Sequence, residues 1–161
     1  MKKTRIPSKS IFAFIITLSF ILVPTTSFGA VAQRQTPLTS PPPTEIRMQG
    51  FFESNNKYLD QGDVSIKDNL DQTVTITVST VSKSTVSSIG ATIYLQKYTG
   101  STWIDVGPAT TITGSNKWYF TGEAKKTTTK GYYFRARTVH WVSNNGTYEQ
   151  GEITSDYILA N

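Results

Sequence analysis

The chain of 161 residues offers few side chains that could do chemistry, and His140 is its only histidine. Any serine–histidine–aspartate mechanism or imidazole metal site would therefore depend on His140. The G-x-S-x-G turn that presents a nucleophilic serine is absent, and no serine stands where the local sequence would activate it. We predict that His140 lies in a strand or at a strand end, satisfied by local hydrogen bonds, and that the protein is not an enzyme.

Several aspartates crowd the first β-type hairpin, and carboxylates of this kind are suitable ligands for Ca²⁺. They are Asp60, Asp63, Asp68 and Asp71. Their spacing matches no EF-hand loop, and Asp is common in turns because its side chain hydrogen-bonds to the nearby backbone. The turn interpretation is the stronger of the two. We therefore predict no metal and no other cofactor, with calcium binding as the alternative.

A more promising group of side chains lies on two segments with β-type sequence, residues 89–97 and 130–142. Alternate residues of the second segment separate into an apolar side and a side that carries tyrosine and arginine. Aromatic rings on a sheet can stack on sugar rings, while Arg and Gln can bond to hydroxyls, carboxylates or phosphates. The predicted ligand-binding residues are Tyr94, Gln96, Tyr133, Arg135, Arg137 and Trp141, with Tyr98 and Trp103 toward the ends of the face.

The same side chains could instead pair across strands and merely cover the sheet, adding a few tenths to about 1 kcal/mol per pair. The binding interpretation would suit peptidoglycan, teichoic acid, another polysaccharide or a protein partner. Single-stranded nucleic acid could use the same residues. The net charge argues against it, because four of the 16 basic residues and none of the 11 acidic ones lie in residues 1–32, which leaves 12 against 11.

Residues 1–32 have the features of a cleaved signal peptide. A basic start is followed by an apolar run of 13 residues, 11–23, and then by a small-residue site with Ala30 and Ala32. We predict cleavage before Gln33, with cleavage after Gly29 or Ala30 as alternatives. The apolar run falls short of the ~20 residues that span a bilayer, so we expect a secreted, extracellular product that meets the membrane only through its leader.

The rest of the chain divides by composition into a linker and one domain. Residues 33–56 hold four prolines and then Phe51 and Phe52, which predicts an extended linker followed by an extra edge strand or a loop packed on the domain. Residues 57–161 form the predicted domain. The chain has no cysteine, which excludes disulfides and Cys-based zinc sites, so the domain must rely on its own hydrophobic core.

Residues 57–161 show period-two alternation and recurrent turn signals, with no apolar residues at helical spacing over a useful length. This pattern predicts an all-β fold, specifically an immunoglobulin-like or fibronectin type III-like β-sandwich of about seven strands. We expect the segment 130–142 to be the penultimate strand, paired with 90–97 and with the C-terminal strand. The expected strand regions are 64–66, 73–81, 89–97, 103–106, 117–121, 132–142 and 147–159.

Several short segments together resemble a family of small exported proteins of Gram-positive bacteria that contain a single domain of unknown function. The segments are residues 62–69, 73–76, 89–97, 103–107 and 130–137, together with His140. The resemblance covers about residues 58 to 160. It implies a leader, one β domain and export, and it brings no established activity or functional residues.

Three functions follow as hypotheses, in order of preference. The first is a secreted, non-catalytic β-sandwich that binds an envelope or extracellular component, such as a cell-wall glycan or a protein, through its aromatic and basic sheet face. The second is a structural protein of an extracellular matrix that self-associates through an exposed edge strand. The third is a small secreted enzyme. The sequence does not specify the oligomeric state.

Overall fold

The computed structural model describes residues 36–44 and 50–161, so the predicted signal peptide and the first residues of the predicted linker lie outside the described residues. Within these ranges the chain forms five strands and no helix, which confirms the all-β prediction. The strands are β1 (Leu59–Asp68), β2 (Thr73–Tyr98), β3 (Trp103–Thr127), β4 (Tyr133–Asn144) and β5 (Thr147–Leu159).

The longest strands, β2 and β3, run through stretches that we predicted as connections. β2 alternates buried and half-buried residues from Val74 onward, because valine, isoleucine and threonine fit a pleated, half-buried surface. The Ser-rich stretch 82–85 does not end the strand. It marks a shift in the register with β3 between Val81 and Val86, where the ladder is irregular and then resumes.

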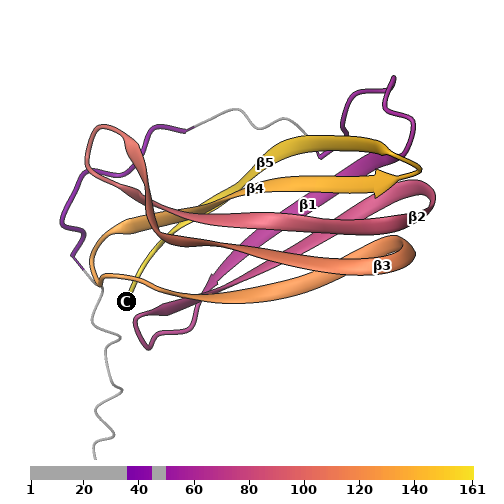
Figure 1. Ribbon diagram of the computed structural model, residues 1–161. Helices are drawn as coiled ribbons and strands as arrows, with labels where there is room; N and C mark the ends of the chain where they lie inside the picture. The colour runs from indigo at the N-terminus through magenta and orange to yellow at the C-terminus, as the bar shows by residue number, and fades with distance from the viewer. Residues whose placement is uncertain (1–35, 45–49) are drawn as a thin grey trace, which may run out of the picture. The chain divides into compact units, whose positions relative to one another are not determined.

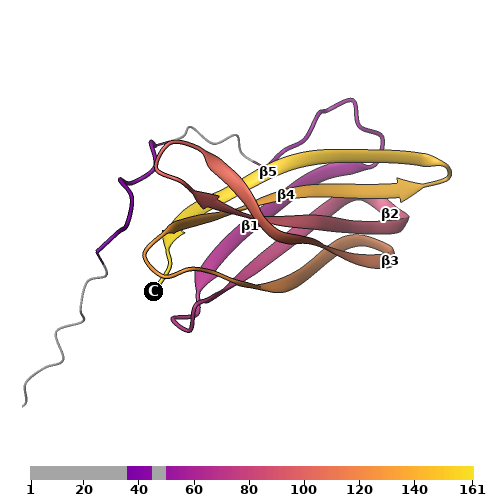
Figure 2. The same ribbon diagram turned by 60° about the vertical axis from the view of Figure 1, so that its left-hand side comes forward.

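All strand pairs are antiparallel, and β2 lies at the centre of the arrangement. β1 pairs with the first part of β2, β4 pairs with its second part, and β3 follows it along nearly its whole length. β5 pairs with β4. The sheet curls, as Figures 1 and 2 show, so that β1 runs close to β5 although the two strands do not pair.

The curled sheet encloses the main hydrophobic core. Val74, Ile76 and Val78 from the first part of β2 meet Ile93 from its second part and Phe134 from β4. Phe134 is almost completely buried, as its place in the alternation predicted. Its ring therefore joins residues from the two parts of β2, and the bend in β2 is what brings them to the same core.

Residues 36–44 and 50–58 are attached to this sheet. In the first segment, the Leu38 N–H donates to the Gly131 carbonyl at 2.8 Å, and Pro42 is buried. In the second, Phe51 forms a bridge with Gln61 of β1, and Phe52 lies on β5 so closely that a Cβ at residue 151 would overlap its ring. Phe51 and Phe52 thus lie against β1 and β5, and neither belongs to a strand.

A single carboxylate ties the start of β1 to β5. Glu149 of β5 accepts hydrogen bonds from three consecutive backbone N–H groups, those of Lys57 at 2.6 Å, Tyr58 at 2.8 Å and Leu59 at 2.8 Å. Burial by itself raises the pKa of Glu149, but the three backbone hydrogen bonds and the charge of Lys83 outweigh it and lower this pKa below its ordinary value.

Candidate binding face

The predicted binding residues lie on one side of four adjacent strands, β3, β2, β4 and β5. The pairing of β2 with β4 places Tyr94 opposite Arg137 and Gln96 opposite Arg135, as the alternation predicted. We call this side the outward face. It carries Tyr94, Gln96, Tyr98, Trp103, Asp105, Tyr133, Arg135, Arg137, Trp141, Tyr148, Gln150, Glu152 and Tyr157.

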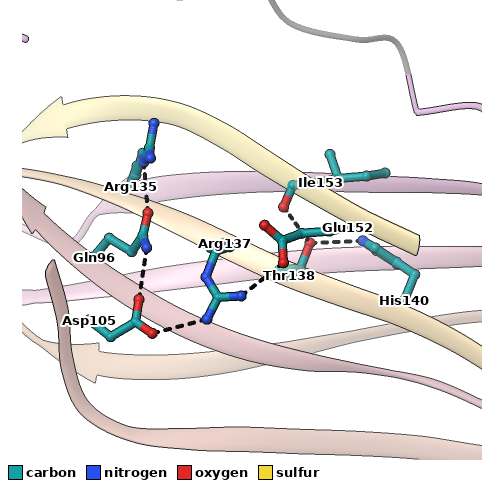
Figure 3. A network of polar contacts seen from close by, with 8 residues as sticks. All are labelled: Gln96, Asp105, Arg135, Arg137, Thr138, His140, Glu152 and Ile153. Carbon is teal, nitrogen blue, oxygen red and sulfur yellow. Dashed lines mark hydrogen bonds and ion pairs between the residues drawn. The ribbon is translucent and has the colours of Figure 1, made fainter. Parts of the chain in front are cut away.

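A chain of hydrogen bonds and ion pairs crosses the centre of the outward face (Figure 3). Arg135 Nε donates to Gln96 Oε1 at 2.9 Å, and Gln96 Nε2 donates to Asp105 Oδ1 at 2.8 Å. Arg137 then bridges two carboxylates, reaching Asp105 Oδ2 at 2.9 Å and Glu152 Oε2 at 2.8 Å. All four strands therefore contribute to one connected network.

Both arginines also lie over aromatic rings. The Arg137 guanidinium is 4.0 Å from the centroid of the Tyr94 ring, and that of Arg135 is 4.3 Å from the Trp103 ring. Such contacts contribute about 0.5–1 kcal/mol at exposed sites. The rings and the carboxylates together hold each planar side chain in a defined position.

The contacts of the network shift the pKa values of Asp105 and Arg137. Burial raises the pKa of Asp105, but hydrogen bonds from Gln96 and Arg137 and the positive charge of Arg137 bring it below its ordinary value. Burial likewise lowers the pKa of Arg137, and its bonds to Asp105 and Glu152 reverse the effect and raise it. Both partners are therefore charged at neutral pH, and each neutralises the other.

Two of the predicted contact residues, Gln96 and Tyr133, lie on the outward face but present little surface. Each is 8% exposed. Gln96 is enclosed by its bonds to Arg135 and Asp105, and the ring of Tyr157 meets Tyr133 edge-on, with centroids 5.6 Å apart. These two side chains pack within the outward face, and its solvent-accessible surface is formed by their neighbours.

The sixth predicted residue, Trp141, lies at the other end of the outward face from this network. It packs against Tyr148 of β5, with ring centroids 6.1 Å apart and planes only 24° from parallel. The indole reaches across Gly90 of β2, where a Cβ would lie 2.9 Å from the ring. The structure thus brings five of the six predicted residues into one half of the face and places Trp141 in the other.

His140 faces inward and is fully buried. Its Nδ1 is 2.8 Å from the hydroxyl of Thr80. Its Nε2 is 2.9 Å from the hydroxyl of Thr138, as Figure 3 shows. Burial lowers the pKa of His140 to about 4, so the ring is neutral at physiological pH. The prediction of a strand histidine satisfied by hydrogen bonds is confirmed, although Thr80 is a distant residue and only Thr138 is local.

Sequence reasoning missed the acidic partners Asp105 and Glu152 and the aromatic partners Tyr148 and Tyr157. These four residues come from β3 and β5, whose register with the central strands local alternation cannot supply. The charge balance of the sequence could have predicted the acidic partners. Two arginines that are partly buried in a nearly neutral domain require carboxylates nearby.

Two of the four aspartates of the first hairpin, Asp68 and Asp71, have side-chain partners in the chain itself. Asp68 accepts the Leu70 N–H at 3.0 Å and the Asn161 N–H at 3.0 Å, and Asp71 is paired with Lys125 at 3.1 Å. Over residues 36–44 and 50–161 no cluster of His, Asp and Glu could hold a metal ion. These contacts favour the turn interpretation of the aspartates.

Comparisons of the chain with known protein families, with curated proteins and with solved structures gave no match. In the part of the chain that the structure describes, no helix has the length and hydrophobicity needed to cross a membrane.

Proposed function

We propose that the protein is a secreted, non-catalytic domain that binds an extracellular component, either a glycan, another cell-wall polymer or a protein, through the outward face. The observation that supports it best is the composition of this face, where aromatic rings from four strands surround a fixed network of arginines and carboxylates. Rings held in place before binding lose little conformational freedom when a ligand arrives, which favours binding.

The surroundings of His140 support the non-catalytic part of the proposal. Its two ring nitrogens face threonine hydroxyls inside the sheet, and Phe52 covers it at a centroid distance of 5.8 Å. A general base must reach a proton of the substrate, and a residue in this position does not reach solvent.

We further infer that the curled sheet is an immunoglobulin-like or fibronectin type III-like sandwich of seven strands. The register shift after Val81 divides β2 and β3 into two parts each, which with β1, β4 and β5 makes seven segments. One group is β1, the first part of β2 and the second part of β3. The other is the first part of β3, the second part of β2, β4 and β5. The predicted leader and the resemblance to exported proteins support the secreted part of the proposed function.

The proposal is tested by sedimentation of the secreted protein with purified Gram-positive cell walls. We expect the protein to bind, and a Tyr148→Ser, Tyr157→Ser double variant to lose most of the binding, because both rings are exposed on the outward face. A Trp118→Ser, Tyr119→Ser variant is the matched control, since it removes two exposed rings elsewhere on β3. Equal binding by the two variants would exclude the outward face.

A structural, self-associating protein is the second candidate. Within the described residues β3 pairs only with β2, so its other edge is open along 25 residues, and Trp118 and Tyr119 are 59% and 44% exposed beside it. An open edge of this kind is a template for pairing with another chain. Sedimentation velocity at increasing protein concentration tests it, and a monomer at every concentration would rule it out.

A further inference from the structure

The two ends of the outward face differ in what already covers their rings. We call one the Trp103 end, made by Tyr98, Trp103, Tyr133 and Tyr157. We call the other the Trp141 end, made by Gly90, Trp141, Tyr148 and Gln150. The rings of the Trp103 end pack against several aromatic neighbours and under Arg135, whereas Trp141 and Tyr148 are paired with each other and Tyr148 is the more exposed of the two outward tyrosines of β5.

The Trp103 end is closed by its own contacts. Tyr98 and Tyr133 are buried, and the Trp103 ring is in contact with Tyr98, with centroids 5.1 Å apart, and lies under the Arg135 guanidinium. Residues 36–44 also run beside this end, where Leu38 bonds to Gly131. Tyr157 is 38% exposed, but a ligand would have to displace these groups before it could reach the other three rings.

The Trp141 end is open. Its two rings are nearly parallel, Tyr148 is 57% exposed, and none of the cation–π contacts found in the described residues falls on either ring. Gly90 leaves room for the indole to lie across β2 rather than project from it. The Tyr148 hydroxyl donates to Gln150 Oε1 at 3.3 Å, and Gln150 is exposed, so its amide group can also donate a hydrogen bond to a ligand.

The charge of the face determines which ligands fit. Arg137 is shared between Asp105 and Glu152, so its positive charge is balanced within the network. With Arg135 included, the network holds two arginines and two carboxylates, so it offers an anionic polymer no net positive charge unless the ion pairs of Arg137 are broken. An uncharged ligand does not need these ion pairs to break, because the Trp141 end offers ring faces and amide and hydroxyl groups.

We infer that the Trp141 end is a binding subsite for an uncharged polysaccharide, with the apolar face of a pyranose ring on Trp141 and Tyr148 and a sugar hydroxyl on Gln150. This inference rests on the proposed function and narrows its ligand from extracellular polymers in general to neutral glycans. It also assigns the arginines a supporting role, because they fix the strands beside the subsite and do not contact the ligand.

The experiment uses the full secreted protein with two groups of probes. Insoluble chitin and soluble xylan serve as neutral glycans, and purified wall teichoic acid and polygalacturonate serve as anionic polymers. We expect binding to at least one neutral glycan, unchanged between about 0.05 and about 0.5 M NaCl because no ion pair forms with the ligand. A Tyr148→Ala variant should bind about tenfold more weakly.

Tyr157→Ala is the matched control, because it removes an exposed tyrosine from the same strand at the Trp103 end. It should bind the neutral glycan as the parent does, and circular dichroism checks that both variants are folded. Binding that is confined to anionic polymers, or that Tyr157→Ala weakens and Tyr148→Ala does not, would overturn the inference while leaving the proposed function intact. Failure to bind cell walls and every probe would overturn the inference and would restrict the proposed function to a protein ligand.

Discussion

Alternate residues of β4 face two environments that treat polar groups in opposite ways. On the inner side His140 is buried, and the lowered pKa keeps its ring neutral. On the outer side Arg135 and Arg137 are half-buried, and carboxylates, amides and ring faces stabilise their charge. The two arginines therefore keep their charge among carboxylates, amides and ring faces, whereas His140 stays neutral among threonine hydroxyls and the Phe52 ring.

The difference separates stability from binding in the same strand. Residues on the inner side of β4 stabilise the fold through the hydrophobic effect, which has no preferred direction and is proportional to the apolar area buried. Outer residues contribute through directed contacts that each stabilise the fold only slightly but fix the positions of the rings. Substitutions on the two sides should therefore change different properties, and the predictions that follow test this from the largest expected effect to the smallest.

Replacing Phe134 with Ala should give the largest loss of stability. The ring is buried in the core between the two parts of β2, so its removal should cost about 3–5 kcal/mol. Denaturant unfolding followed by tryptophan fluorescence measures this. Val139→Ala on the outer side is the matched control, with an expected cost of about 1 kcal/mol or less. Similar losses from the two variants would contradict the distinction between the sides.

His140 should make the fold sensitive to mild acid. Its pKa is about 4 in the folded protein and near its ordinary value of 6.5 in the unfolded chain. The unfolded state therefore binds the proton more readily. The contribution of the neutral His140 ring to the free energy of unfolding is complete above pH 6.5. It is lost as the pH falls toward 4, and the total loss is about 3 kcal/mol.

Unfolding free energies between pH 7 and 5 test this prediction, because the carboxylates stay ionised over that range. A His140→Gln variant should be less stable at pH 7 but should lack the slope, since His140 is the only histidine of the chain. The same slope in the variant would show that another group is responsible.

Glu149 of β5 gives a further test of how the sheet treats charged groups, because its carboxylate stays charged although it is partly enclosed. Three backbone N–H groups stabilise its carboxylate, so Glu149→Gln should cost about 2 kcal/mol near pH 7. Because its folded pKa is lowered, this stabilisation is complete above the ordinary value of 4.5 and is lost as the pH falls through the lower folded value. The variant and the parent should therefore converge in stability in acid, and a constant difference would refute the role of the charge.

Arg137 should give the smallest change in stability. Its partners Asp105 and Glu152 are largely exposed, so Arg137→Met should cost about 1 kcal/mol or less, and high salt should reduce the difference. A double-mutant cycle with Asp105→Asn isolates the ion pair. A loss as large as that of Phe134→Ala would mean that the network holds the fold together, which would contradict the proposed division of roles.

Period-two alternation was enough to predict the two sides of β4 and its main neighbours. Tyr94, Gln96, Arg135 and Arg137 fall where local sequence placed them, because each strand is regular between its irregular points. The buried position of Phe134 follows from the same pattern. The part of the outward face that alternation placed correctly is thus the part carried by two regular, adjacent strands.

The rest of the face depends on irregular points that alternation does not reveal. In β5 the register shift between the partners of Arg135 and Arg137 brings Tyr157 to the same side as Glu152, although simple alternation would place them on opposite sides. The continuity of β2 escaped prediction for a similar reason. Its Ser-rich stretch resembles a loop, but Ser82 pairs with Leu59 of β1 and the pairing with β3 resumes at Val86.

The pairing of β2 with β3 has a consequence for how the chain folds. It runs from Tyr98 and Trp103, beside the turn at Thr99–Thr102, out to Thr73 and Thr127. Each new pair forms next to an existing one, so the entropic cost of closure is small at every step. Among the five described strands β5 pairs only with β4, which must itself find β2 first. Substitutions in the turn should therefore slow refolding, whereas substitutions in β5 should mainly speed unfolding.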